Sequence, residues 1–134
     1  MDARVTFRVL KFGGTSVGST ESLIRVADIL RETVAARLTP IAVVSAASGV
    51  TDALLAAIRT ATEHPNAAPD AVEGIRARLT DLYAPLLGST QRVDEVLEPL
   101  VAELTDLLRG VSLLRECSER TQDLIVSFGE RSSM

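Results

Sequence analysis

Apolar and polar residues alternate in blocks along the N-terminal part of the chain, and these blocks predict a strand, a helix and a second strand. Val5 to Leu10 and Ile41 to Ser45 are short runs rich in β-branched and apolar residues, the pattern of strands. We expect the first strand to be buried towards its C-terminal end and the second to be buried. Between them, apolar residues recur at helical spacing, from a cap at Ser19 or Thr20 to about Arg37. A strand–helix–strand segment of this kind is the βαβ unit, which has parallel strands. The sequence therefore predicts an α/β fold.

After the second strand, the sequence predicts another helix and then a loop. Either Ser48 or Thr51 can cap a helix that continues through Ile58. The stretch from His64 to Asp70 is rich in residues that favour turns. We expect a loop there, with His64 as a solvated side chain rather than a catalytic one.

The rest of the chain is predicted to form helices with apolar stripes, which are typical of packing faces. One stripe ends at Pro85 to Gly88, and a second ends near Gly110, with Pro99 expected to kink or split it. A last helix is predicted from Thr121 to Phe128, and it carries the Gly-Glu-Arg segment that follows. The apolar positions of the first two stripes are Val72, Ile75, Leu79, Leu82 and Tyr83, then Val93, Val96, Leu97, Leu100, Leu104, Leu107 and Leu108.

Composition indicates one modest domain and argues against several classes of protein. The chain has 134 residues, 46% of them hydrophobic but only 3% aromatic, so its core must be aliphatic. A net charge of −4 argues against nucleic-acid binding. Cys117 is the sole cysteine, so no internal disulfide is possible, which suits a reducing compartment. Because no apolar run resembles a membrane span or a secretory signal, we expect a cytoplasmic protein without a membrane partner.

The strongest chemical signal is the turn after the first strand, Lys11-Phe12-Gly13-Gly14-Thr15-Ser16. Two glycines let the backbone approach a bulky ligand, and the N–H groups of such a turn and of the following helix favour an anion. Lys11 adds a mobile positive charge suited to phosphate. The spacing matches neither the P-loop nor the dinucleotide-binding fingerprint, so this would be a different phosphate cradle. An ordinary turn with a solvated lysine is the alternative.

The end of the second strand supplies another candidate, Ser45. Ligands of parallel sheets lie beyond the C-terminal ends of the strands, so Ser45 and Lys11 are expected to point into the same crevice. This expectation depends on the βαβ geometry alone.

Three segments together resemble the aspartate kinases, which belong to the amino-acid kinase superfamily. The segments are Lys11–Val17, Val43–Asp52 and Ser127–Ser133, and they occur in the family's order. The resemblance implies the carbamate kinase-like fold, a three-layer α/β/α sandwich. Residues 1–134 would be the N-terminal part of the catalytic domain, with two parallel strands and several helices.

The resemblance also implies which residues bind ATP. Lys11 would act in catalysis by contacting the phosphates, and the backbone of Gly13 and Gly14 would approach them closely. Ser45 would face the phosphates or the acceptor carboxylate. The remaining donors of the turn would be the hydroxyls of Thr15 and Ser16.

Two further residues match positions that bind the substrate aspartate in this family. Thr51 can donate a hydrogen bond to a carboxylate of the substrate, and Glu130 is suited to its α-ammonium group. Without the resemblance, Thr51 could be a plain helix cap, and Glu130 a surface carboxylate paired with Arg131 or with a neighbouring turn.

The implied reaction transfers the γ-phosphate of ATP to the side-chain carboxylate of L-aspartate. It gives 4-phospho-L-aspartate, the first step towards lysine, threonine and methionine. Mg²⁺ would accompany ATP, although the sequence contains no evident metal-ligand cluster. The remainder of the kinase domain, with its catalytic aspartate and adenine pocket, and the regulatory ACT domains are absent from these 134 residues. We therefore expect the chain alone to be inactive.

Two alternatives remain open. The chain could belong to another enzyme of the superfamily, one that acts on glutamate, acetylglutamate, carbamate or a nucleoside monophosphate. It could also be a non-catalytic module that mediates oligomerisation or binds a nucleotide. In either case two strands make a poor sheet with exposed edges, so we expect a homo-oligomer.

Overall fold

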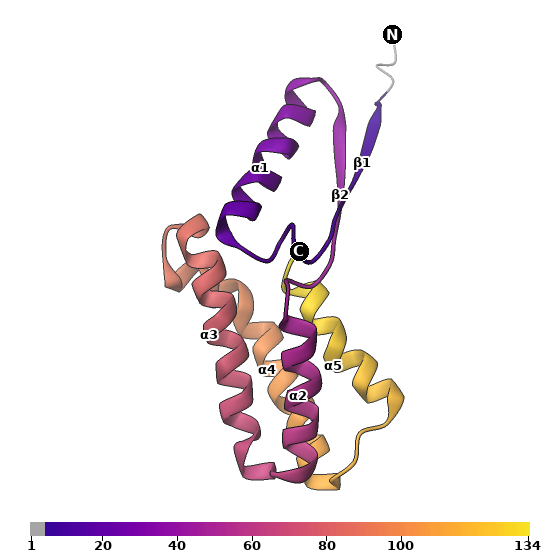
Figure 1. The fold of residues 1–134 in the computed structure, drawn as a ribbon, viewed down its shortest axis with the longest axis vertical. Coiled ribbons are helices and arrows are strands. Elements are labelled where there is room, and N and C mark those ends of the chain that lie inside the picture. The colour runs from indigo at the N-terminus through magenta and orange to yellow at the C-terminus, as the bar shows by residue number, and fades with distance from the viewer. Residues whose placement is uncertain (1–4) are drawn as a thin grey trace.

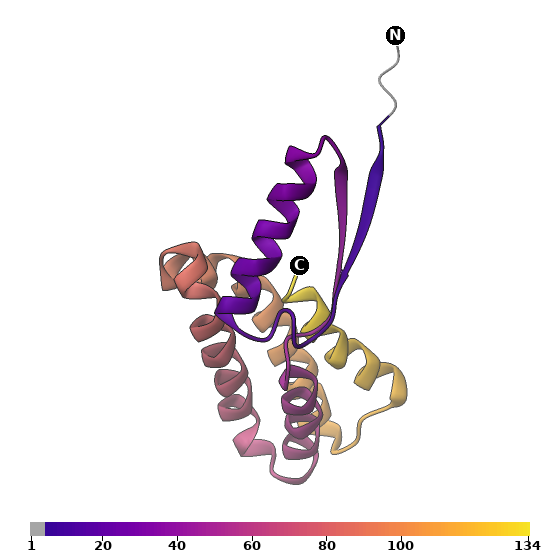
Figure 2. The same ribbon diagram turned by 45° about the horizontal axis from the view of Figure 1, so that its top comes forward.

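The computed structural model describes residues 5–134, which form a small α/β part and a helical bundle (Figures 1 and 2). The α/β part contains two strands and the first helix, and the remaining four α-helices form the bundle. The loops that follow the two strands lie where these parts meet. The C-terminus reaches the same junction, so segments far apart in the sequence lie together there.

The predicted βαβ unit is confirmed. Strands β1 (Phe7–Phe12) and β2 (Thr39–Val44) form a parallel sheet, in register from the Phe7–Thr39 pair to the Phe12–Val44 pair. Helix α1 (Thr20–Ala35) connects them. Ser19 caps α1 as predicted, because its hydroxyl accepts a hydrogen bond from the Ser22 N–H at 3.1 Å. β1 is shifted towards the C-terminus from the predicted run, so Lys11 lies within the strand.

The sheet is packed on one face only, which corrects the prediction of a buried second strand. The first strand is buried at its C-terminal end, as predicted. Side chains alternate between the two faces of a sheet. Phe12 is on the face that packs against α1 and is only 7% exposed. A strand is buried only when an element covers each of its faces. The opposite face is open in the described chain, and between 44% and 67% of each of its apolar residues is exposed; these are Phe7, Val9, Ile41 and Val43.

Helix α2 (Val50–Glu63) begins without the predicted side-chain cap. Its N-cap residue is Gly49, which has a left-handed backbone (φ +78°), and neither Ser48 nor Thr51 caps the helix. Glycine adopts this conformation without steric strain. The chain therefore turns directly from the loop into the helix.

The stretch from His64 to Asp70 is largely helical, contrary to the predicted loop. A short 3₁₀ helix, η1 (Pro65–Ala67), leads directly into α3 (Ala68–Leu87). Pro65 and Pro69 both lie in first turns, where a missing N–H group costs no helical hydrogen bond. Residues that favour turns mark two helix starts here rather than a loop.

Helix α4 (Thr90–Leu114) is longer than predicted, because it continues through Pro99 and past Gly110. The proline removes one backbone hydrogen bond. Buried residues on both sides of it, Leu97 and Val101, hold α4 in the bundle, so packing outweighs the local cost. Helix α5 (Glu119–Arg131) begins slightly earlier than predicted and carries the Gly-Glu-Arg segment as expected.

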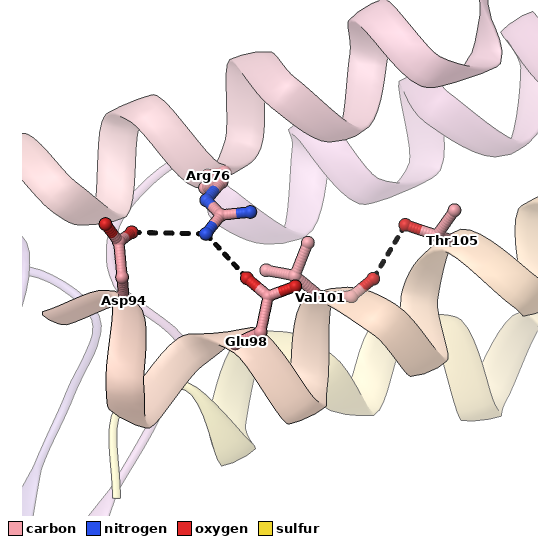
Figure 3. A network of polar contacts seen from close by, with 5 residues as sticks. All are labelled: Arg76, Asp94, Glu98, Val101 and Thr105. Atoms are coloured by element: carbon pink, nitrogen blue, oxygen red, sulfur yellow. Dashed lines mark hydrogen bonds and ion pairs between the residues drawn. The ribbon is translucent and has the colours of Figure 1, made fainter. Parts of the chain in front are cut away.

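The apolar stripes of α2, α3, α4 and α5 form one core. Polar contacts fix the helices at its surface: Arg76 on α3 donates to Asp94 at 3.2 Å and to Glu98 at 2.6 Å, both on α4 (Figure 3). The Thr20 hydroxyl donates to the Leu82 carbonyl oxygen at 3.0 Å and ties α1 to α3. The largest fully buried hydrophobic side chains are Phe128, Leu54, Leu79, Leu97, Leu104, Leu108 and Ile125.

Candidate functional site

The loops that follow β1 and β2 lie side by side and are joined through their backbones (Figures 1 and 2). The Ser45 N–H donates to the Phe12 carbonyl oxygen at 3.1 Å, and the Ser48 N–H donates to the Gly14 carbonyl oxygen at 3.2 Å. Both strands are parallel, so both loops leave the same end of the sheet. We call the segment from Gly13 to Gly18 the Gly turn and the segment from Ser45 to Gly49 the β2–α2 loop.

Glycines allow the two loops to approach closely. A Cβ atom on Gly14 would lie 3.0 Å from the Ala46 carbonyl oxygen, and one on Gly18 would lie 2.9 Å from the Ser48 Cβ. Gly13 differs, because a Cβ atom there would have no neighbour within 4 Å. Gly14 and Gly18 therefore serve packing, whereas Gly13 has open space on the side where a Cβ atom would project.

The register of the sheet relates Lys11 to Ser45. Lys11 lies opposite Val43, and Ser45 follows two positions later, directly after the end of β2. The Ser45 N–H continues the pairing with Phe12. The Lys11 side chain is exposed and forms no ion pair within residues 5–134, and Ser45 is partly buried. By strand alternation, the two side chains leave the same face at the carboxyl end of the sheet.

Helix α5 brings Glu130 to this end of the sheet through a close contact at Gly129. A Cβ atom on Gly129 would lie 2.8 Å from the Ala46 Cβ, so the backbone of α5 touches the β2–α2 loop directly. The Glu130 side chain is exposed. Its neighbour Arg131 forms an ion pair with Glu103 on α4 at 2.7 Å rather than with Glu130. The alternative interpretation of Glu130 as the partner of Arg131 is therefore wrong.

The ion pair between α4 and α5 also has an electrostatic effect. The hydrogen bond from Arg131 holds the pKa of the Glu103 carboxyl below its ordinary value, and this outweighs the opposing effect of desolvation. The negative charge that neutralises Arg131 thus comes from α4. Within residues 5–134, Glu130 forms no ion pair.

Thr51 and the two hydroxyls of the Gly turn have different surroundings. Thr51 is the second residue of α2 and is partly buried, and it does not act as the cap. Ser16 donates its N–H to the Gly13 carbonyl oxygen at 2.9 Å. Thr15 and Ser16 line a hollow of about 330 Å³ between the Gly turn and α1, together with Ser22 and Arg25.

Sequence reasoning missed two arginines near these loops. Arg25, expected on the wetter side of α1, lines the hollow beside Thr15 and Ser16. Arg78 on α3 donates a hydrogen bond to the Ser48 carbonyl oxygen at 2.6 Å. Helical periodicity could identify Arg25 as an exposed residue of α1, but no local pattern connects Arg78 with a loop thirty positions earlier in the sequence.

The donor set at this end of the sheet suits an anion better than a metal ion. Its candidate donors are the ammonium group of Lys11 and the hydroxyls of Thr15, Ser16 and Ser45. The N–H groups of Ser16, Ser45 and Ser48 already donate to backbone carbonyl oxygens. Within residues 5–134, no three His, Cys, Asp or Glu side chains are grouped so that they could hold a metal ion. No helix in the same range combines the length and the apolar character needed to cross a bilayer.

Comparisons with known proteins point to one family. The model of the amino acid kinase family matches residues 6–134. Aspartokinase 1 and aspartokinase 2 of Arabidopsis thaliana, both described as chloroplastic, are 31% and 32% identical to the chain over 122 residues. These alignments include 91% of this chain but only 21% and 22% of the relatives.

Two solved structures of E. coli aspartokinase III are similar in fold. The complex with lysine and aspartate gives a TM-score of 0.73 at 27% identity, and the complex with aspartate and ADP gives 0.76 at 29% identity. Each match covers 95% of this chain and 27% of the solved chain.

These matches confirm the predicted fold class, the α/β portion at the N-terminus of an amino acid kinase fold. The chain spans about a fifth of the length of its curated relatives. It belongs to the amino acid kinase family.

Proposed function

We propose that the chain is the N-terminal part of an aspartate kinase, which transfers the γ-phosphate of ATP to the side-chain carboxylate of L-aspartate. One observation carries the proposal: the Gly turn, the β2–α2 loop and the end of α5 meet at the carboxyl end of the sheet. In the proposed site, the ammonium group of Lys11, the hydroxyls of the two loops and the carboxylate of Glu130 would act on the same pair of ligands. The similarity to aspartokinases over nine tenths of the chain supports the choice of substrate.

The phosphates of ATP would bind at the Gly turn. Phosphoryl transfer needs positioned charge more than covalent chemistry, because negative charge is spread over the oxygens of the transferred group. Lys11 would contribute the cation, and the open backbone at Gly13 would let the phosphates approach. The hydroxyls of Thr15, Ser16 and Ser45 would donate hydrogen bonds.

L-Aspartate would bind between α2 and α5. Its α-ammonium group would pair with the exposed carboxylate of Glu130, and a carboxylate of the substrate would accept a hydrogen bond from the hydroxyl of Thr51. The N-terminus of α2 favours negative charge at this position. The main contribution of this chain to the rate of phosphoryl transfer would be to hold the acceptor carboxylate beside the phosphates.

Mg²⁺ does not fit a site made by this chain alone, because the described residues offer no carboxylate cluster for it. It would arrive with the nucleotide, bound to phosphate oxygens.

The rest of the proposal concerns the parent enzyme. The chain would form the N-terminal portion of a catalytic domain whose other residues complete the ATP site, so residues 1–134 alone should not turn over substrate. The parent would be cytoplasmic and would act at the first step of lysine, threonine and methionine synthesis.

A fusion protein tests the proposal. The chain is joined to the part of E. coli aspartokinase III beyond the matched region, and L-aspartate is compared with glutamate, acetylglutamate, carbamate and a nucleoside monophosphate as acceptor. We expect an acyl phosphate, trapped by hydroxylamine, with aspartate alone. Lys11→Met should reduce the rate by about 10² to 10³, the usual cost of one charge-stabilising group. Arg8→Met, on the opposite face of β1, should leave the rate unchanged.

The fusion protein and the 134-residue chain also test the two alternatives, another enzyme of the superfamily and a non-catalytic module. Turnover with another acceptor would indicate a different enzyme of the superfamily, and ATP-dependent phosphorylation of aspartate by the 134-residue chain itself would refute its predicted inactivity. Calorimetric titration of the chain with ATP–Mg²⁺ and with L-aspartate addresses the non-catalytic alternative. Absence of heat with either ligand would favour a structural module.

A further inference from the structure

The backbone of Ser48 is held from two sides, and α3 supplies one of them. The Ser48 N–H donates to the Gly14 carbonyl oxygen at 3.2 Å, which joins the β2–α2 loop to the Gly turn. The Ser48 carbonyl oxygen accepts a hydrogen bond from Arg78 Nη2 at 2.6 Å. Both polar groups of one exposed loop residue are therefore fixed by partners outside the loop.

Gly49 lies in direct contact with the same guanidinium group of Arg78. A Cβ atom on Gly49 would lie 2.7 Å from Arg78 Nη2 and 3.2 Å from Cζ, so the arginine packs directly against the backbone of Gly49. The left-handed conformation of Gly49 (φ +78°) also favours glycine. Because Gly49 is the N-cap of α2, the contact also fixes where that helix begins.

Helix α3 is a rigid support for Arg78. The adjacent residue Leu79 is fully buried in the core of the bundle. Arg76 ties the same turn of α3 to Asp94 and Glu98 on α4. Within residues 5–134, Arg78 has no carboxylate within ion-pairing distance, so its hydrogen-bonding capacity is directed to the loop.

From this geometry we propose that Arg78 is a positioning residue, which holds the β2–α2 loop against the Gly turn in the arrangement that the candidate site requires. The loop carries Ser45 at its start and delivers Thr51 immediately after its end. Arg78 acts on both through the Ser48–Gly49 backbone and need not touch a ligand itself. The inference rests on the proposed function only in assigning the loop to ligand binding. The clamp, by which we mean the contact of Arg78 with the Ser48–Gly49 backbone, can be measured without any ligand.

Amide hydrogen exchange in the 134-residue chain tests the clamp. We expect Arg78→Met to accelerate exchange of the Ser48 amide by about tenfold to a hundredfold, the range that follows from losing a hydrogen bond to a charged donor. Arg78→Lys should restore most of the protection, because an ammonium group can still donate to the Ser48 carbonyl oxygen. Core amides such as that of Leu104 should exchange as in the unmodified chain.

A matched control is available on the neighbouring helix. Arg92 also donates a guanidinium hydrogen bond to a backbone carbonyl oxygen, that of Leu87, at 3.3 Å. This bond joins the start of α4 to the end of α3 and does not involve the β2–α2 loop. Arg92→Met should leave exchange at Ser48 unchanged. Unchanged exchange at Ser48 in Arg78→Met would overturn the proposal. So would an equal acceleration at Ser48 and Leu104, which would mean that Arg78 stabilises the whole fold rather than the loop.

A titration of the same variants with L-aspartate, followed by amide shifts, separates this inference from the proposed function. If the unmodified chain binds aspartate, Arg78→Met should weaken binding about tenfold or more and Arg78→Lys should recover it. Equal affinity in all three proteins would overturn the positioning role. If the unmodified chain does not bind aspartate, that result counts against the proposed site in this chain, and the exchange rates alone then decide on the clamp.

Discussion

At the scale of single residues, replacing Gly110 and Gly129 by alanine should change the stability of the protein in opposite directions. Alanine favours a helix over glycine by about 1 kcal/mol. At Gly110 on α4 a Cβ atom meets nothing within 4 Å, so Gly110→Ala should stabilise the protein by up to about that amount. At Gly129 a Cβ atom would lie 2.8 Å from the Ala46 Cβ and 3.5 Å from Leu54 Cδ1. Gly129→Ala should therefore destabilise by about 1–3 kcal/mol, the cost of overpacking.

Urea unfolding of the two variants and the unmodified chain gives both values. Gly74→Ala on α3 is a second control, since it too has open space around the added methyl group. A stabilising Gly129→Ala would mean that α5 can withdraw from the β2–α2 loop without cost. In that case the contact between Gly129 and Ala46 would not fix the position of Glu130.

Tyr83 provides a residue-scale test of burial at the junction of α3 with the C-terminus. Burial raises the pKa of its phenol above the ordinary value near 10, and a weak hydrogen bond with Ser133 at 3.4 Å opposes the rise only in part. The unfolded chain therefore ionises at a lower pH than the folded one. Stability should be unaffected by this group below about pH 10 and should fall as the pH rises beyond it.

The chain has one tyrosine and no tryptophan, so the ultraviolet absorbance of the phenolate reports this group alone. We expect its titration midpoint to be higher in the folded chain than in denaturant. Tyr83→Phe should remove this contribution to the loss of stability at high pH. Identical midpoints in the two states would show that the phenol is solvated.

At the scale of elements, the Arg76 network should contribute a small, salt-dependent part of the contact between α3 and α4. The guanidinium donates to Asp94 and Glu98, whose side chains are 46% and 60% exposed, so solvent screens both pairs (Figure 3). Arg76→Met should cost at most about 1 kcal/mol at low salt and less at high salt. Arg31→Met breaks a more exposed pair within α1 and should cost less still. Urea unfolding at two salt concentrations measures the loss of stability in both variants. If the loss in Arg76→Met does not depend on salt, Arg76 stabilises the contact by packing rather than by its charge.

Local sequence patterns predicted elements well where one rule acted alone. Ser19 caps α1 as its residue type predicts. The two apolar runs on either side of α1 form strands, as their β-branched residues predict. Local sequence patterns were misleading where tertiary packing determines how far a helix extends or how it is capped. Pro99 would interrupt an isolated helix, but buried Leu97 and Val101 carry α4 through it. The cap of α2 is Gly49 rather than a hydroxyl residue, because Arg78 occupies the space beside it.

The candidate site was predictable only in part, for a related reason. The motifs identified Lys11, Gly13 and Ser45, and the parallel register explains why they share one end of the sheet. No periodicity could show that Arg131 pairs with Glu103 rather than with Glu130. Such contacts depend on how α4 and α5 pack, and that is a property of the assembled bundle.

At the scale of the whole molecule, the open face of the sheet should drive association. It exposes Phe7, Val9, Ile41 and Val43 side by side, and each strand of the two-stranded sheet has one edge without a strand partner in the described chain. Exposed apolar patches and free edges favour pairing with another polypeptide. Further polypeptide of the kind present in the longer relatives could cover this face. In the 134-residue chain on its own, a second copy is the available partner.

We therefore expect the purified chain to associate with increasing concentration, as measured by sedimentation velocity. Val9→Lys should shift it to monomer, because an ammonium group on the open face cannot be buried against an apolar partner without a large desolvation cost. Leu113→Lys is the matched control, since Leu113 is 79% exposed but lies at the end of α4 in the bundle, and it should leave association unchanged. Association abolished by Leu113→Lys but not by Val9→Lys would place the contact on the bundle instead. A chain that stays monomeric at every concentration would mean that neither the open face nor the free strand edges drive association.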